Sequence, residues 1–279
     1  MKIGLLLSKI RPEEKMLTDD MKKKGIDYEN IIDEEHVFDL SKNKFEIDAV
    51  LERSLSFSKG LYISKIFEGF DVPVINKSRV AEICGDKFLT TQALLKNNVS
   101  TPKVMMAFSE KSALAAVEEM GYPAVLKPVT GSWARLISKV NDKESAESII
   151  EHKSVLGHYM HSIFYVQEYV QKPGRDIRAF FVGDETIAAI YRNSEHWITN
   201  TARGGVASNC IVSDEINELC IKAAKAVGGG VLAMDLFESK DGLTVNEINH
   251  TMEFKNSVAP TRIDIPGKII DYVIGEARR

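Results

Sequence analysis

The stretch "VLAMDLFESKDGLTVNEIN", residues 231–249, contains two apolar, β-prone runs separated by Lys240, Asp241 and Gly242. This pattern predicts a β-hairpin, with Gly242 at a turn position that tolerates positive φ. If the loop has three residues, Asp235 lies directly opposite Glu247 on the neighbouring strand. Because side chains two apart share one face of a strand, Asn249 points the same way as Glu247. The hairpin is therefore predicted to bring two carboxylates and one amide to a single patch of sheet.

These three side chains form a candidate magnesium site. Two carboxylates that lie so close repel each other unless a cation joins them. Ligands that offer only oxygen suit Mg²⁺, which completes its coordination with water and nucleotide phosphates. A polar outer face of the sheet is the alternative interpretation. The apolar neighbours favour a site instead: they are Met234, Leu236, Val245 and Ile248.

Two lysines lie at positions suited to binding an anion. Lys87 follows Gly85–Asp86 at the start of a predicted helix, and Lys127 ends the apolar strand "AVLK". Either could be a surface lysine at the end of an element. Lys127 is harder to explain in that way, since a strand buried on both faces seldom ends in a cation without an anionic partner. The loop "TGSWAR" (130–135) follows it, and the backbone amides of such a loop can cover phosphates.

The segment "QEYVQKPGRDIR" (167–178) carries a second kind of signal. Glu168 ends an apolar strand, where a carboxylate and nearby backbone groups could read an adenine edge and ribose hydroxyls; a solvated strand end is the alternative. Guanidinium groups, which suit carboxylates and phosphates, follow within about thirty residues. They belong to Arg175, Arg178, Arg192 and Arg203, the last beside two glycines that let a ligand approach the backbone.

The order of predicted elements indicates three regions. Residues 1–76 alternate strands and helices as a small doubly wound α/β sheet does. A helical segment at 78–98, broken at Gly85, precedes a second unit with helices at 109–120 and about 142–156. Strands dominate from residue 163 onward, with a helix at 214–227 and another from about 266. We therefore predict an α/β and α+β protein divided into residues 1–85, 86–165 and 166–279.

Composition excludes several classes of protein. A net charge of −4 and a pI near 5.9 give no basic footprint for nucleic acid. The cysteines, Cys84, Cys210 and Cys220, are widely spaced and suggest reduced thiols in a cytoplasmic protein. His158 and His161 lack a third ligand nearby in the sequence and are expected to be surface or core histidines. No apolar run approaches the length of a membrane span.

Taken together and in order, the motifs resemble those of the ATP-grasp carboxylate–amine ligases. The resemblance covers nearly the whole chain and is greatest to the branch that contains the ribosomal-protein glutamate ligases and the lysine-biosynthesis ligases. It rests on Lys87 and on "VLKP" (125–128), "GSWAR" (131–135), "QEYV" (167–170), "GRDIRAFFVG" (174–183), "AIYR" (189–192), "NTARGG" (200–205), "MD" (234–235) and "NEIN" (246–249). It implies an ATP-grasp fold with a small N-terminal pre-ATP-grasp domain, and ATP bound between two α+β subdomains.

The resemblance also implies roles for individual residues. ATP would be bound by Lys87, Lys127, Gly131, Ser132, Trp133, Ala134, Arg135, Leu136, Ile137, Gln167, Glu168, Tyr169, Val170, Arg175, Asp176, Arg178, Arg192 and Asn200. Two Mg²⁺ ions would be held by Asp235, Glu247 and Asn249, with Glu247 bridging them. Lys127, Arg192 and Arg203 would stabilise the transferring phosphoryl group. The implied chemistry is activation of a carboxylate as an acyl phosphate, followed by attack of an amine.

A polar pair after the metal motif, Asn256–Ser257, bears on the substrate. Lysine-pathway members of the family carry a similar pair, Asn followed by Ser or Thr, at this place, whereas glutamate-specific members of the arginine pathway carry Gly-Phe. The resemblance therefore implies that L-2-aminoadipate is joined to the C-terminal glutamate of a small acidic carrier protein. Lys255 and Arg203 are candidates for meeting the acidic tail of that carrier.

Three alternatives stay open. They are a glutamate–carrier ligase of arginine biosynthesis (or dual specificity), a ribosomal-protein glutamate ligase, and a nucleotide-binding regulatory protein without turnover. The complete metal set argues against the last of these. The family resemblance suggests a homodimer or homotetramer.

Overall fold

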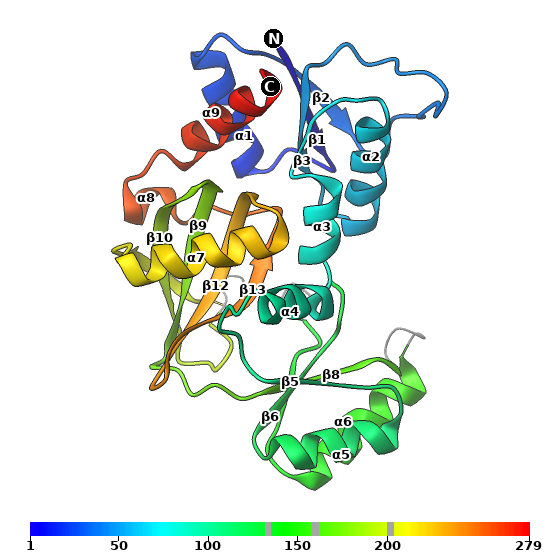
Figure 1. The fold of residues 1–279 in the computed structure, drawn as a ribbon, viewed down its shortest axis with the longest axis vertical. Helices are drawn as coiled ribbons and strands as arrows, with labels where there is room; N and C mark the ends of the chain where they lie inside the picture. The colour runs from blue at the N-terminus through cyan, green and yellow to red at the C-terminus, as the bar shows by residue number, and fades with distance from the viewer. Residues whose placement is uncertain (132–134, 158–161, 200–203) are drawn as a thin grey trace.

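The N-terminal part of the protein is a small α/β sandwich, seen at the top of Figure 1 in a computed structural model that describes residues 1–131, 135–157, 162–199 and 204–279. Its four strands are all parallel, in the order β2-β1-β3-β4. They are β1 (Lys2–Leu7), β2 (Asp27–Ile32), β3 (Ala49–Arg53) and β4 (Val74–Ile75). Parallel strands need crossover connections, and here α1 (Pro12–Lys23) and α2 (Phe57–Gly69) supply two of them.

Both faces of this parallel sheet are buried, which explains the nearly continuous apolar run in β1. Leu5 and Leu7 pack against α1 and the C-terminal helix α9 (Ile265–Ala277), whereas Leu6 packs on the α2 side. Figure 1 shows α1 and α9 on one side of the sheet and α2 on the other. The predicted doubly wound N-terminal domain is therefore confirmed.

The central subdomain, at the bottom of Figure 1, is an antiparallel sheet in the order β5-β8-β6-β7 with two helices on one face. Its elements are β5 (Val104–Ala107), α5 (Glu110–Met120), β6 (Ala124–Lys127), β7 (Ser138–Val140), α6 (Lys143–Leu156) and β8 (Phe164–Glu168). Leu126 and Val166 pack under the helices. Their neighbours Val125, Lys127 and Gln167 point to the opposite face, where they line a cavity.

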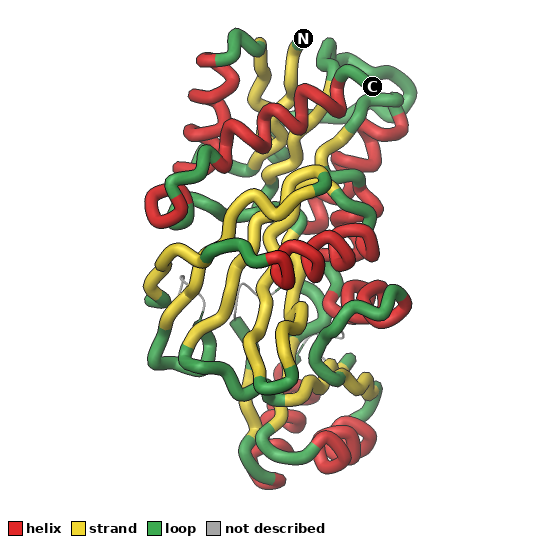
Figure 2. Tube along the Cα trace, turned by 60° about the vertical axis from the view of Figure 1, so that its left-hand side comes forward, coloured by secondary structure: helices red, strands yellow, loops and turns green. Residues whose placement is uncertain are grey.

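The C-terminal subdomain is a five-stranded antiparallel sheet in the order β11-β10-β9-β12-β13. Figure 2 shows these long strands, in yellow, between the other two parts. The strands are β9 (Arg175–Gly183), β10 (Glu185–Asn193), β11 (Val206–Cys210), β12 (Gly230–Ser239) and β13 (Gly242–Asn249). One face is covered by α7 (Asp214–Val227) and by α3 (Ser78–Cys84) and α4 (Lys87–Lys96). A short helix, α8 (Val258–Thr261), follows the last strand.

The second face of this sheet is apolar at one end and charged at the other. At one end Phe180 and Val231 pack against the N-terminal domain and α9. At the other end the same strands carry Asp176, Arg178 and Asp235, which line the cavity. Alternation along β9 places Asp176, Arg178 and Phe180 on one face, so a single strand contributes both to the core and to the cavity.

Most predicted elements are present, including the helices on either side of Gly85 and the helix at 214–227. The strands β2, β7 and β11 were not predicted, because "DYENII", "SKV" and "VASNC" are too polar or too short to stand out. Packing does not follow the chain order everywhere: α4 packs on α7, and α9 packs on α1. In the described part of the chain, no helix is both long enough and apolar enough to cross a membrane.

Candidate active site

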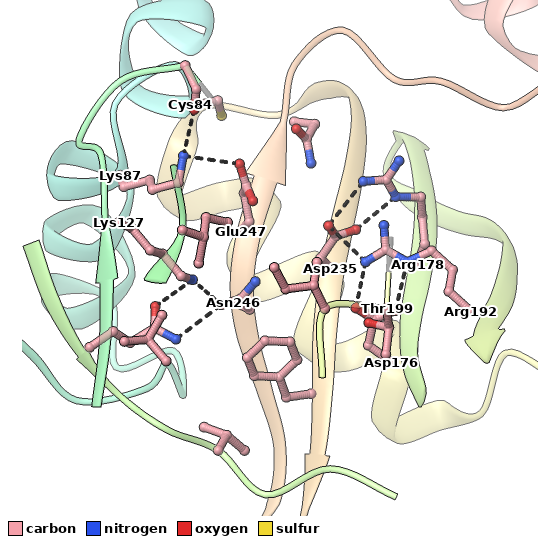
Figure 3. A pocket seen from close by; sticks show the side chains of 18 of the residues that line it. Cys84, Lys87, Lys127, Asp176, Arg178, Arg192, Thr199, Asp235, Asn246 and Glu247 are labelled. Carbon is pink, nitrogen blue, oxygen red and sulfur yellow. Dashed lines mark hydrogen bonds and ion pairs between the residues drawn. The ribbon is translucent and has the colours of Figure 1, made fainter. Parts of the chain in front are cut away.

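A cavity lies where the three parts of the protein meet. The C-terminal sheet lines it with Asp235 and Glu247, the central subdomain with Lys127 and Gln167, and the N-terminal domain with residues such as Phe57. Figure 3 shows the acids in the middle, two lysines on one side and two arginines on the other. Segments more than a hundred residues apart in the sequence therefore converge on one site.

Strand register places charged side chains in a row across the sheet. Arg192 on β10 pairs with Asp176 on β9, Arg178 on β9 pairs with Asp235 on β12, and Asp235 pairs with Glu247 on β13. Side chains at paired positions lie on the same face at close range. The predicted opposition of Asp235 and Glu247 is confirmed.

The hairpin reaches this register by a different route from the predicted one. The turn has two residues, Lys240 and Asp241, because Ser239 pairs with Gly242, whose φ is +101°. The expected three-residue loop was therefore wrong. A bulge restores the register: Leu236 pairs with Val245 and Asp235 with Glu247, so Asn246 has no partner on β12.

The bulge has a chemical consequence. In a regular strand Asn246 and Glu247 would point to opposite faces, but here both line the cavity. The Asn246 Oδ1 atom accepts hydrogen bonds from Lys127 Nζ at 2.8 Å and from Gln167 Nε2 at 3.3 Å. Asn246 therefore connects the β12–β13 hairpin to the central subdomain.

Asp235 is held by two arginines. Arg178 donates from Nε at 2.8 Å and from Nη2 at 3.0 Å, and Arg192 Nη2 lies 3.0 Å from Oδ2. Arg192 also forms a two-point pair with Asp176, with both distances 2.7 Å. Burial alone would raise the pKa of Asp235, but the two guanidinium groups outweigh it and hold that pKa below its ordinary value. The carboxylate is therefore ionised at neutral pH.

Lys127 is a buried cation whose protein partners are neutral. Its Nζ donates to Gln167 Oε1 and to Asn246 Oδ1, each at 2.8 Å, and it forms no ion pair with any described residue. The anionic protein partner that we expected for it is therefore not found in the described chain. Burial lowers the pKa of Lys127 to about 8, although Glu247 acts in the opposite direction. An anionic ligand would supply the missing charge.

Lys87 lies beside the same acids. It is the first residue of α4, whose N-cap is Asp86, and this fixes its direction. Its Nζ donates to the Gly131 carbonyl oxygen at 3.0 Å and lies 3.4 Å from Glu247 Oε1. Lys87 and Lys127 therefore reach the cavity from two different elements.

The end of the cavity formed by residues 167–170 combines polar, aromatic and apolar side chains. Glu168 Oε1 accepts from the backbone N–H of Lys103 at 2.6 Å, which fixes the strand end. The Tyr169 and Trp197 rings lie 6.3 Å apart between centroids, and Lys139 Nζ lies 5.0 Å from the Tyr169 ring. Such a wall suits a flat, apolar base with polar edges.

The donor set at the hairpin fits a magnesium ion that also takes ligands from a bound nucleotide. Asp235, Glu247 and Asn249 all line the cavity and offer oxygen. Among the described residues no group of three His, Cys, Asp or Glu side chains could hold a metal without help. The buried Asn249 Nδ2 atom has no described hydrogen-bond partner, so this amide is not committed to the protein there. An unpaired buried N–H donor of this kind indicates an acceptor such as a phosphate or water oxygen, and Oδ1 is the atom of this amide that could bind a cation.

Not every predicted ATP-binding residue faces the cavity. Arg175 lies on the other face of the sheet, where it pairs with Glu238 at 2.8 Å and stacks 3.8 Å from the Tyr191 ring. This corrects its predicted role, and the reason is alternation: Asp176 and Arg178 point to one face and Arg175 to the other. Gly131 and Ile137 line the cavity, whereas Arg135 and Leu136 do not.

Several predicted residues have other positions. Asn256 is exposed and Ser257 is buried beside α8, and neither lines the cavity, which ends in this part of the chain at Glu253. Five other predicted site residues lie outside the described residues: Ser132, Trp133, Ala134, Asn200 and Arg203. The two histidines of "GHYMH", His158 and His161, lie outside them as well.

Sequence reasoning missed several lining residues. Lys172 Nζ donates to Thr199 Oγ1 at 3.0 Å and lies 4.8 Å from the Phe237 ring. Burial lowers the pKa of Lys172. No local pattern distinguishes this lysine from a surface one. Asn246 was not predicted either, because strict alternation would turn it away from Glu247 and only a bulge brings both to one face.

Comparison with known proteins agrees with this geometry. The RimK-like ATP-grasp domain matches residues 84–273, and the LysX preATP-grasp domain matches residues 3–83. The alpha-aminoadipate–LysW ligase LysX of Saccharolobus solfataricus is 37% identical over 91% of this chain and 94% of its own length. The glutamate–LysW ligase ArgX of Sulfurisphaera tokodaii is 33% identical over 98% of each chain.

Solved structures show the same fold. A RimK domain ATP-grasp protein from Sphaerobacter thermophilus superposes with a TM-score of 0.84 at 21% identity, covering 99% of this chain and 100% of that one. The D-alanine–D-alanine ligase of Bacillus anthracis gives 0.73 at 16% identity, covering 100% and 98%. The match of both domain families over nearly the whole chain, with relatives above 30% identity, shows that this protein belongs to the RimK-like ATP-grasp ligases that carry a LysX-type preATP-grasp domain.

Proposed function

We propose that this protein joins the α-amino group of L-2-aminoadipate to the C-terminal glutamate side chain of a small acidic LysW-like carrier protein, in lysine biosynthesis. ATP-grasp ligases in general use ATP and Mg²⁺. The observation that carries the proposal is Lys127, a buried cation in the cavity whose described partners are two amide oxygens. Nucleotide phosphate is the anion that suits this position.

In the proposed reaction a carboxylate oxygen of the carrier attacks the γ-phosphorus of ATP and the bond to the β-phosphate oxygen breaks, releasing ADP. The ammonium group first loses one proton to solvent, and its free amine nitrogen then attacks the acyl carbon. The C–O bond to phosphate breaks, and a second proton leaves the nitrogen with the departing phosphate. Lys87 and Lys127 approach from one side, and Arg178 and Arg192 from the other. These four cations would hold the phosphates and offset the charge on the transferring group.

We further propose that Asp235, Glu247 and Asn249 hold two Mg²⁺ ions, with Glu247 bridging. When bound, the ions would neutralise phosphate charge and orient the γ-phosphate. Asp235 would share its carboxylate with Arg178 and Arg192, since each carboxylate oxygen has two lone pairs. The predicted contributions of Ser132, Asn200 and Arg203 stay part of the proposal.

The preference for aminoadipate has two supports: the Asn256–Ser257 pair and the 37% identity to a relative named as an aminoadipate ligase. A glutamate–carrier ligase is the second candidate, favoured by the 33% identity to ArgX over 98% of each chain. A homodimer or homotetramer in the cytoplasm, with neither nucleic acid nor membrane as partner, completes the proposal.

The proposal is tested by incubating the protein with a LysW-type carrier, ATP, Mg²⁺ and each amino acid in turn. We expect the carrier mass to increase by one aminoadipate residue only when ATP and Mg²⁺ are both present. Equal rates with glutamate would contradict the aminoadipate preference, and no conjugation with either amino acid would contradict the function.

Glu247→Gln separates the metal assignment from folding. It removes the proposed bridging carboxylate but keeps the shape of the side chain, which is only partly buried. We expect ADP formation to fall at least about a hundredfold, in line with the loss of one electrostatic contact to the transition state. The melting temperature without ligands should change little. Turnover close to that of the unmodified protein would exclude Glu247 as a metal ligand.

A further inference from the structure

One end of the cavity lies between the N-terminal domain and residues 250–253. Its walls include Ser54, Leu55 and Phe57 on one side and Thr251 and Glu253 on the other. Among the described lining residues of this end, Glu253 is the single carboxylate, and no lysine or arginine accompanies it. The four cations proposed to bind phosphate come instead from α4, β6, β9 and β10. The lining of this end therefore holds a carboxylate and none of the four cations proposed to bind phosphate.

Glu253 is fixed in position but retains a free oxygen. Its Oε1 accepts a hydrogen bond from Arg11 Nη1 at 3.0 Å, and its side chain is 38% exposed. Arg11 is itself anchored, because its Nε and Nη2 donate to Glu14 at 3.0 and 2.8 Å. Within the described chain no donor reaches Glu253 Oε2. The carboxylate is therefore oriented by one cation and able to bind a second.

The N-terminal domain also holds the chain on either side of Glu253. Glu52 Oε2 accepts from Thr251 Oγ1 at 2.8 Å, and Arg53 Nη1 donates to the Met252 carbonyl oxygen at 2.7 Å. The backbone N–H of Lys255 lies 3.4 Å from Glu13 Oε1. Residues 251–255 are therefore held by contacts that do not depend on Glu253 itself.

We propose that Glu253 binds the α-ammonium group of the acceptor amino acid, and that Arg11 is a positioning residue for its carboxylate. An amino acid whose amine attacks an acyl group arrives as an ammonium ion and needs an anionic partner. Glu253 supplies that charge four residues after Asn249 and three before the Asn256–Ser257 pair. Because Asn249, Thr251 and Glu253 all line the cavity, the amine would lie at the end of the cavity next to the residues proposed to hold magnesium. This inference rests on the proposed function.

The test uses Glu253→Gln in the intact protein with a LysW-type carrier, ATP and Mg²⁺. We expect the KM for L-2-aminoadipate to rise about ten- to hundredfold, as expected when a charged hydrogen bond is lost. The KM for ATP should not change. Trapping of the activated carrier with hydroxylamine, which needs no amino-acid site, should proceed at the unmodified rate. Glu253→Asp, which keeps the charge on a shorter side chain, should show an intermediate KM.

Glu185→Gln is the matched control, because Glu185 forms an exposed 2.8 Å pair with Lys268 and neither residue lines the cavity. It should leave every constant unchanged. Calorimetric titration of L-2-aminoadipate into the protein with nucleotide decides the inference independently of turnover: equal binding to the unmodified protein and Glu253→Gln, or binding to neither, overturns it. If the unmodified protein forms neither conjugate nor hydroxamate, it is the proposed function that fails. A parallel loss of ATP affinity and melting temperature in Glu253→Gln would show a structural role and also overturn the inference.

Discussion

At the residue scale, the buried ammonium group of Lys127 lowers the free energy of unfolding of the ligand-free protein and leaves a positive charge available to an anion. Its ammonium group is buried, and its pKa is about 8 instead of the ordinary 10.5. Between these two values the unfolded chain binds more protons than the folded one, so the free energy of unfolding rises with pH in that window. The folded protein therefore carries a cost of about 3 kcal/mol at neutral pH for this one charge. A bound phosphate would remove most of that cost.

Lys127→Met tests directly whether the buried charge lowers the stability of the protein without ligands. At pH 7 we expect the variant without ligands to be about 1–3 kcal/mol more stable, since two amide oxygens lose a donor but the charge burial ends. The difference should shrink as pH approaches 10. ATP should no longer raise the melting temperature. Urea unfolding at pH 7 and pH 10 measures the first effect, and a variant less stable than the unmodified protein at pH 7 would contradict it.

At the element scale, the hairpin β12–β13 owes its chemistry to one extra residue. The two-residue turn alone would place position 246 opposite Asp235. The bulge shifts Glu247 into that place and turns Asn246 toward Lys127. Both neighbours of the polar pair, Val245 and Ile248, stay in the core. The strand thereby presents two adjacent polar residues on one face without exposing an apolar one.

Deletion of Asn246 should therefore be tolerated by the fold. Glu247 would move into the position opposite Asp235 without a bulge, and Val245 and Ile248 would still face the core. Lys127 and Gln167 would lose their common acceptor, so we expect the KM for ATP to rise about tenfold, the equivalent of one hydrogen bond. Circular dichroism and ATP titration check both parts.

Deletion of Val245 is the matched control for this variant. This variant has the same length as the Asn246 deletion, but it places Asn246 opposite Leu236, on the buried face. A polar group forced into that core should destabilise the protein by several kcal/mol. If the two deletions unfold at the same urea concentration, the account of the bulge is wrong.

At the scale of the whole molecule, buried charges connect the N-terminal domain to the segment that follows β13. Arg53, which is 4% exposed, donates to Glu14 Oε1 at 3.0 Å and to the Met252 carbonyl oxygen at 2.7 Å. Its guanidinium also lies 5.9 Å from the Phe254 ring. The N-terminal domain thus orients residues 252–254, which follow the β12–β13 hairpin.

Arg53→Met should weaken this connection. It leaves the buried Glu14 with one cation where there were two, and the Met252 carbonyl oxygen without its donor, so we expect a loss of about 3–5 kcal/mol in the free energy of unfolding. Urea denaturation followed by tryptophan fluorescence measures it. Lys59→Met, which breaks an exposed ion pair with Glu34 in the same domain, serves as the control and should leave stability nearly unchanged. An equal effect of both variants would exclude a special role for Arg53.

The sequence by itself determined the fold class, most elements, and the opposition of Asp235 and Glu247. These depend on local periodicity, turn residues and strand pairing between neighbours, which short stretches of chain specify. The residues themselves pointed to Lys87, Lys127 and the segment 167–178, and the family resemblance added their assignment to ATP. Arg175 was misplaced because its neighbours alone do not reveal which face of β9 is turned to the cavity.

Only the tertiary structure decided where the site ends and which residues complete it. The contacts of Asn246 with Lys127, of Arg53 with Met252 and of Glu253 with Arg11 arise between segments far apart in the chain. Such contacts depend on how three separate sheets pack together. No periodicity within a single strand or helix encodes that packing, because it is set by the shapes of all the surfaces that meet.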